Sequence, residues 1–226
     1  MSDKQTDGHS VALAVVALFA GILIGIVAAG IYSVDDEVVT TGEEKIGISE
    51  TQSRYGTTLK TNLQAHVLLG IDSLHSTYED RDGAEFARLA FIENAEDIAA
   101  TFGVVFGDEV EDELSQYLSE YVTAMNDLAE VSREGDAGDV AAAEEAIDEA
   151  ALELAAYLVE LTEEDSEVGF RDGLLEHNQN ILGVFNAYAA GNFEESYRLL
   201  GEATTHLRIF SDLVTEAVVE AHPGRF

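Results

Sequence analysis

The stretch Leu174–Phe193, LLEHNQNILGVFNAYAAGNF, carries the pattern that decides the fold. Its apolar residues recur at spacings of three and four, which places them on one face of an α-helix, and His177 lies within that apolar stripe. Asn192 and Glu195 follow with the spacing of a capping box, which marks the start of another helix. The stretch therefore predicts the first helix of a helical hairpin and the turn into the second.

The same frame occurs twice upstream. His66 and Tyr121 each follow a leucine by three residues, as His177 does. The separation is 55 residues from position 66 to 121 and 56 residues from 121 to 177. A repeat at a constant period indicates stacked copies of one supersecondary unit, so we interpret the chain as three αα-hairpins that arose by duplication.

Helical spacing continues over the whole region 49–226, and no sustained alternation indicates a strand. Capping boxes are expected at four places, and glycines are expected to separate helices at Gly103, Gly107, Gly135, Gly138 and Gly191. The four boxes are Ser49 with Gln52, Asp82 with Glu85, Asp108 with Glu111, and Asn192 with Glu195. These signals predict six helices, near 49–79, 83–103, 108–133, 139–160, 166–190 and 192–220. Short links between long helices favour an all-α, up-down bundle.

An apolar segment, Val11–Tyr32, precedes this domain. Its 22 uncharged residues are long enough to cross about 30 Å of hydrocarbon as a helix, so we expect a single-pass transmembrane anchor. Residues 1–10 form a short tail and residues 33–48 a linker. Lys4 before the span weakly favours the bulk of the chain outside the cell membrane. Cleavage after Ala29, and a pilin-like N-terminus processed at Gly8, remain alternatives.

The composition is strongly acidic. There are 45 Asp and Glu residues against 11 Lys and Arg, a formal net charge of −34, while 46% of the 226 residues are hydrophobic. Such a charge excludes non-specific nucleic-acid binding, and the apolar content excludes a disordered acidic tail. Because salt screens self-repulsion, we expect a halophilic protein, of an archaeon. The rival explanation, calcium binding, lacks an EF-hand loop, and the absence of cysteine excludes thiolate metal sites and covalent haem attachment.

Five polar residues fall on the predicted apolar faces: His66, Asn94, Tyr121, His177 and His206. Buried polar groups need partners, so one interpretation is a hydrogen-bonded layer that fixes helix register. The other is a site in which the three histidines bind a transition metal such as copper or zinc, with Asn94 and Tyr121 as inward polar support. The chain lacks H-x-x-x-H and Glu-x-x-His pairs, which disfavours a di-iron site. His75 is expected to face solvent.

No nucleophile motif, phosphate loop or dinucleotide fingerprint occurs in the sequence, so no enzyme activity is predicted. The first hypothesis is a membrane-anchored extracytoplasmic helical domain with a binding or structural role. The alternative is a module that binds a metal or small ligand through its inward histidines, as a sensor or carrier. The membrane is the expected partner, together with a protein partner or a second copy of the chain.

Segments in the region 60–226 resemble an uncharacterised helical repeat module of bacterial and archaeal surface proteins. The matching segments include LQAHVLLGI, ENAEDIAATF, FGDEVEDELSQYLSEYV and the long run EHNQNILGVFNAYAAGNFEESYRLLGEATTHLRIFSDLV with the ending HPGRF. Members often carry the labels copper amine oxidase or glycosyltransferase by annotation transfer. The resemblance implies the helical fold and no established activity. A histidine is common in the module where this chain has Tyr121, which weakens the case for a metal site.

Overall fold

A computed structural model describes residues 48–162 and 167–226, and this part of the chain is all-α without strands. Its six long helices and one short 3-10 turn are α2 (Glu50–Tyr78), α3 (Ala84–Phe106), α4 (Asp108–Glu134), α5 (Ala137–Thr162), α6 (Glu167–Ala189), α7 (Phe193–Ala221) and η1 (Pro223–Arg225). The six predicted helices are confirmed, with ends that agree to within three residues. The predicted anchor at 11–32, the tail before it and nearly all of the linker lie outside the described residues.

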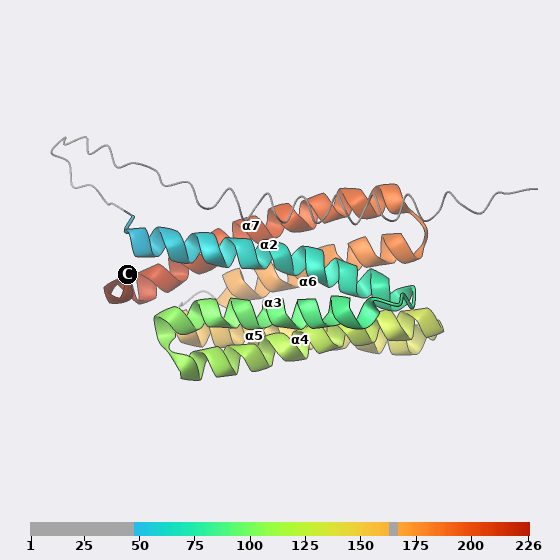
Figure 1. Ribbon diagram of the computed structural model, residues 1–226, viewed down its shortest axis with the longest axis horizontal. Helices are drawn as coiled ribbons and strands as arrows, with labels where there is room; N and C mark the ends of the chain where they lie inside the picture. Colours follow the sequence, from blue (N-terminus) through green and yellow to red (C-terminus); the bar gives the residue numbers. More distant parts are fainter. Residues whose placement is uncertain (1–47, 163–166) are drawn as a thin grey trace, which may run out of the picture. The chain divides into compact units, whose positions relative to one another are not determined.

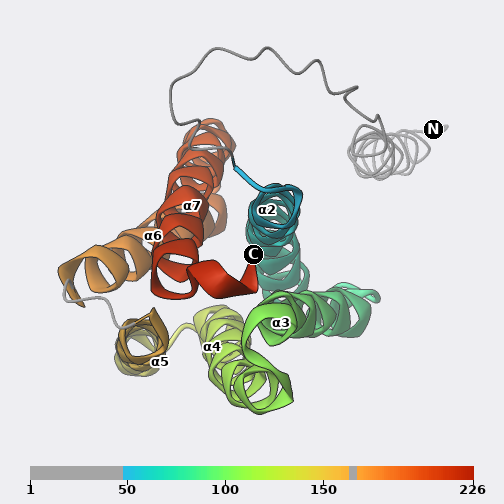
Figure 2. The same ribbon diagram turned by 90° about the vertical axis from the view of Figure 1, so that its left-hand side faces the viewer.

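Consecutive helices run antiparallel, and each packs against the next along the chain (Figure 1). The last helix, α7, returns to pack against the first, α2, so the six helices close into a ring (Figure 2). Helix α2 also contacts α4 and α6, the first helices of the other two hairpins. Ring closure buries a stripe of every helix against two neighbours and the centre, as the periodicity of the sequence requires. None of the described helices has the length and apolar character needed to cross a bilayer.

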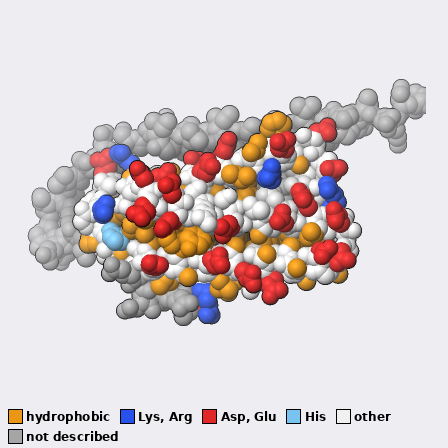
Figure 3. Space-filling model, turned by 90° about the horizontal axis from the view of Figure 1, so that it is seen from below, with side chains coloured by type: hydrophobic (Ala, Val, Ile, Leu, Met, Phe, Trp, Pro, Cys, Tyr) orange, Lys and Arg blue, Asp and Glu red, His pale blue; other side chains and the backbone are white. Residues whose placement is uncertain are grey.

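Buried apolar side chains from all six helices form one continuous core, with Leu74 of α2 and Phe185 of α6 fully buried. The surface is acidic. Figure 3 shows one face on which carboxylates greatly outnumber basic side chains, with apolar side chains gathered in a band along its middle. The acidic residues of the sequence therefore lie mainly on the solvated surface, around an apolar helical core.

Two of the four predicted capping boxes are wrong. Helices α3 and α4 begin after Gly83 and Gly107, and neither start has a side-chain cap. Asp108, predicted as a cap, is already the first helical residue of α4. Ser49, by contrast, forms a full capping box with Gln52, in which each side chain accepts a hydrogen bond from the backbone N–H of the other.

Gly103 and Gly138 were predicted as breaks but lie inside α3 and α5, so these predictions are wrong. A side chain at Gly103 would place its Cβ 2.9 Å from the Cβ of Glu111, which real structures do not tolerate. The glycine there serves the close approach of α4 to α3 instead of a turn. The breaks at Gly107, Gly135 and Gly191 are confirmed, since all three adopt positive φ between helices.

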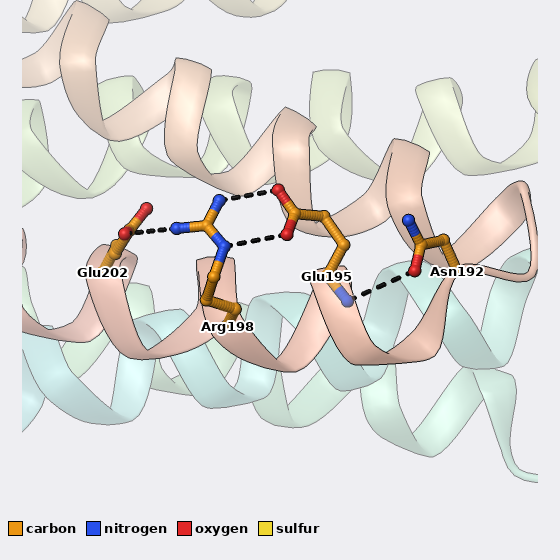
Figure 4. Close-up of polar contacts among 4 residues, drawn as sticks. All are labelled: Asn192, Glu195, Arg198 and Glu202. Atoms are coloured by element: carbon orange, nitrogen blue, oxygen red, sulfur yellow. Dashed lines mark hydrogen bonds and ion pairs between the residues drawn. The ribbon is translucent and has the colours of Figure 1, made fainter.

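The start of α7 confirms half of the last predicted capping box, because the backbone N–H of Asn192 donates to the carbonyl of Ala187 and not to the Glu195 side chain. The Asn192 side chain accepts a hydrogen bond from the backbone N–H of Glu195 at 3.4 Å (Figure 4). One turn later, Arg198 binds the Glu195 carboxylate at 2.6 Å and also pairs with Glu202 (Figure 4). These groups are exposed, so the pairs contribute little to stability.

Candidate functional site

The three repeat residues meet at the centre of the bundle. The ring of His66, from α2, lies 6.0 Å from that of Tyr121, from α4, and 6.3 Å from that of His177, from α6. The Tyr121 and His177 rings are 6.4 Å apart. The constant spacing in the sequence thus places one polar ring from the first helix of each hairpin at the same level of the bundle. All three side chains are at most 5% exposed, so the inward prediction is confirmed for them.

His66 is held by Asn94. Its Nδ1 lies 3.0 Å from Oδ1 of Asn94, whose amide nitrogen donates to the backbone carbonyl of Asn62 at 3.0 Å. Because a carbonyl can only accept, the amide nitrogen of Asn94 must face Asn62, and its oxygen must face His66. Nδ1 of His66 therefore carries the proton, and Nε2 is left as an acceptor. Burial lowers the pKa of His66 to about 4 against the raising effect of Asn94, so the ring is neutral at pH 7.

Tyr121 is held in a similar way by α6 and α5. Its hydroxyl donates to Oδ1 of Asn178 at 2.9 Å, and the Asn178 amide donates to Oδ1 of Asp148 at 2.9 Å and to the carbonyl of Ile147 at 3.3 Å. Burial, and then the charge of Asp148, raise the pKa of the Tyr121 hydroxyl. Asn178 is fully buried, and it was not among the inward polar residues predicted from the sequence. Its position four residues after Leu174 and three before Ile181 places it on the same stripe and could have identified it.

His177 differs from the other two. The side chain is 3% exposed, yet its Nδ1 has no hydrogen-bond partner among the described residues. Burial holds the pKa of His177 well below its usual value, and the nearby His66 and His206 lower it further. A buried polar atom without a partner costs about 1–3 kcal/mol. His177 is therefore a neutral imidazole at the bundle centre with one nitrogen that no described group of the protein binds.

His206 does not join this cluster. Its Nε2 lies 2.8 Å from the backbone carbonyl of Gly173, and its Nδ1 lies 3.4 Å from Oε1 of Glu176, both on α6. Within residues 48–162 and 167–226, no three histidine or carboxylate side chains converge to hold a metal ion. A copper or zinc site made by His66, His177 and His206 stays a prediction that this arrangement does not favour.

A cavity of about 50 Å³ lies inside the bundle beside the cluster. All six helices line it, half of the lining residues are leucines, and its wall is almost wholly apolar although His66, Tyr121 and His177 are among the lining residues. By comparison, an apolar cavity of about 150 Å³ binds benzene, and about 10–15 Å³ is needed for one water. The cavity can thus hold a few non-hydrogen atoms as it stands, and more if its leucines change rotamer.

The C-terminal segment covers one end of the bundle. Phe226 packs edge-on against Tyr55 at 5.4 Å, and Tyr55 packs against Phe102, a cavity-wall residue, at 6.2 Å. His222 donates a hydrogen bond from Nε2 to the backbone carbonyl of Leu161 at 3.1 Å, because a carbonyl oxygen can only accept. Figure 2 shows the C-terminus lying over the middle of this end.

The expectation that His75 faces solvent is wrong. Its ring stacks on Tyr188 of α6 with 3.5 Å between centroids, and its Nε2 is buried without a partner among the described residues. Burial, with Arg81 next, lowers the pKa of His75 to about 4, against the raising effect of Glu79. The position near the end of α2 suggests exposure, but Tyr188 in the last turn of α6 stacks on the ring, and only the tertiary structure brings that turn there.

Comparison of the chain with protein-family models, with curated proteins and with solved structures gave no match. The resemblance to the surface-protein repeat module stays a prediction.

Proposed function

We propose that this chain is a membrane-anchored, extracytoplasmic helical module that binds a small molecule in its central cavity, as a carrier or the sensing part of a receptor. The observation that carries the proposal is a cavity at the centre of the bundle that has His177 among its lining residues. All six helices line the cavity, its wall is almost wholly apolar, and His177, whose buried Nδ1 has no partner among the described residues, is one of the residues around it. Unpaired buried polar groups are rare in folded proteins and are often explained by a function.

The competing explanation is a purely structural layer. It accounts well for His66 with Asn94 and for Tyr121 with Asn178, since these networks are closed within the protein. Such networks fix helix register. A structural layer does not account for His177. If the layer served only to fix helix register, an apolar residue at this position would leave no buried nitrogen unpaired and would cost less.

The cellular setting belongs to the same proposal. The uncharged run Val11–Tyr32 supports an anchor, and the net charge of −34 supports life in concentrated salt. No catalytic constellation is found among the described residues, so binding rather than catalysis is the activity we propose. A protein partner or a second copy of the chain would then relay or receive what is bound.

The test compares two leucine substitutions on the same helix, α5. Leu154 lines the cavity and is 6% exposed, whereas Leu152 lies on the outer face and is 40% exposed. The full-length protein, held in lipid nanodiscs in molar KCl, is titrated with xenon and observed by ¹²⁹Xe NMR. We expect saturable binding in the wild type and in Leu152→Phe, and its loss in Leu154→Phe, whose ring fills the cavity.

A second cavity-filling variant, Ala151→Val, guards against misfolding of Leu154→Phe, since Ala151 also lines the cavity and valine adds only two carbon atoms there. Circular dichroism establishes that each variant remains helical. If the wild type shows no saturable site, or if the folded filling variants bind as the wild type does, the proposed function is wrong and the structural layer is the better account.

A further inference from the structure

Gly201 lies at an exposed position in the middle of α7, and the described residues give no reason for a glycine there. A glycine inside a helix is destabilising relative to alanine. A Cβ at Gly201 would meet no atom within 4 Å, whereas Cβ atoms at Gly70 and Gly173 would press against the rings of Phe91 and Phe210. Those two glycines let helices of this chain approach closely. Gly201 permits the same close approach on a face of α7 that is open.

A shallow groove lies beside Gly201 between α7 and α2, two helices that lie side by side in the ring (Figure 2). Leu68 of α2 and Leu200 of α7 are among the residues that line it, and none of its lining residues is an aspartate or a glutamate. The chain as a whole carries 45 of these acidic residues. Because two copies of so acidic a protein repel each other, a surface without carboxylates is where they can approach with the least repulsion.

The outer surface of α7 also exposes an unusual number of apolar side chains. Of the nine large apolar side chains that are exposed in the described part of the chain, four belong to α7: Phe193, Tyr197, Ile209 and Leu213. Tyr197 is 65% exposed, lies one turn before Gly201 and borders the groove. Large apolar side chains gathered on one exposed helix, with a tyrosine among them, are typical of a surface that contacts another protein.

Two opposite charges lie symmetrically about Gly201. Glu194 is seven residues before it and Arg208 is seven residues after it, and both are exposed. Seven residues make nearly two turns, so each charge lies within about 20° of Gly201 around the helix and about 10 Å from it along the axis. Neither group forms an ion pair with another described residue, whereas Arg198 of the same helix pairs with two carboxylates (Figure 4). The face therefore complements a second copy of itself that runs in the opposite direction.

We propose that two copies of this chain pair through the outer face of α7, with the two α7 helices antiparallel and crossing at Gly201. A two-fold axis there places each residue opposite the one equally far on the other side of Gly201. Arg208 then meets Glu194 of the partner subunit, and the symmetry forms this contact twice. A parallel pair would place Arg208 against Arg208 and Glu194 against Glu194, which is unfavourable. This interface goes beyond the proposed function and does not depend on the central cavity.

The test measures self-association of the full-length protein in detergent micelles in molar KCl, by sedimentation equilibrium at several ratios of protein to detergent. We expect a dimer. Arg208→Glu should raise the dissociation constant at least about fivefold, because both symmetric contacts become repulsive. Adding Glu194→Arg to this variant should restore the dissociation constant to within about twofold of the wild type. The second change exchanges the two charges, so it restores only a contact between these two positions.

Gly201→Leu tests the close approach of the helices. A leucine at the crossing point would hold the two backbones apart, so the dissociation constant should rise at least about tenfold. The monomer should unfold in urea at no lower concentration than the wild type, because no described atom lies within 4 Å of the new Cβ and leucine favours a helix. Ala141→Leu, at an exposed position of α5, is the matched control and should leave the dissociation constant unchanged.

The outcomes that overturn the proposal are defined. If the full-length protein is monomeric at every ratio of protein to detergent, the proposed pairing is wrong. A dimer that Arg208→Glu and Gly201→Leu leave as tight as the wild type would form through another surface, which also overturns it. If Glu194→Arg fails to restore the Arg208→Glu dimer, the antiparallel arrangement is wrong. Xenon binding should be the same in Gly201→Leu as in the wild type, so failure of the pairing and failure of the cavity function can be told apart.

Discussion

Acidification should unfold this protein partly through His66, and the size of the effect follows from its surroundings. Burial lowers the pKa of His66 from 6.5 to about 4. His66 therefore binds a proton near pH 6.5 in the unfolded chain but only near pH 4 in the folded chain. The contribution of His66 to the free energy of unfolding is fully present above pH 6.5 and is lost as the pH falls toward 4. The full difference of about 2.5 pKa units corresponds to about 3 kcal/mol, of which about 2 kcal/mol is lost by pH 5.

The assay is urea unfolding followed by circular dichroism at pH 7, 6 and 5, at a fixed molar concentration of KCl. The reference is His66→Asn, because the asparagine amide nitrogen can take the place of Nδ1 and donate to Asn94 without titrating. The many carboxylates titrate alike in both proteins, so the difference between their pH profiles isolates His66. We expect the wild type to lose about 2 kcal/mol more than the variant between pH 7 and 5.

His75→Asn extends the comparison to the second shielded histidine, whose pKa burial also lowers to about 4. Because the folded pKa of both histidines lies near 4, its contribution should be similar to that of His66. Parallel pH profiles for the wild type and His66→Asn would refute the reasoning, since they would mean that His66 titrates equally in the folded and unfolded chains.

Two further predictions concern packing and topology. Gly173→Ala should destabilise the protein by about 1 kcal/mol, because the new Cβ would lie 2.5 Å from the ring of Phe210 and the cost of overpacking exceeds the gain in helix propensity. Gly201→Ala, where nothing lies within 4 Å, should instead stabilise it by about 0.5–1 kcal/mol, and urea unfolding measures both. For topology, protease added to intact cells should degrade the domain 49–226, and protection of this region until the cells are lysed would place it inside and contradict the proposed orientation.

The secondary structure and the inward-facing cluster could be predicted from the sequence because both depend on local periodicity. Helical spacing and short links were enough to predict six antiparallel helices. The constant interval between His66, Tyr121 and His177 was enough to predict that they hold equivalent positions in three hairpins and point inward. Capping was less predictable: Asp108 lies at a plausible cap position, but Gly107, with φ of 99°, ends α3 and starts α4 without it.

Tertiary structure alone decided what the polar groups do. His66 and His206 both fall on apolar stripes, but one donates to Asn94 at the bundle centre while the other binds the carbonyl of Gly173 on the neighbouring helix. Periodicity specifies the face of a helix on which a residue lies, whereas the rotation and closure of the ring specify which group on another helix it meets. For the same reason no pattern in the sequence could show the cavity, or that His177 would be left beside it without a partner, because both arise only where all six helices pack together.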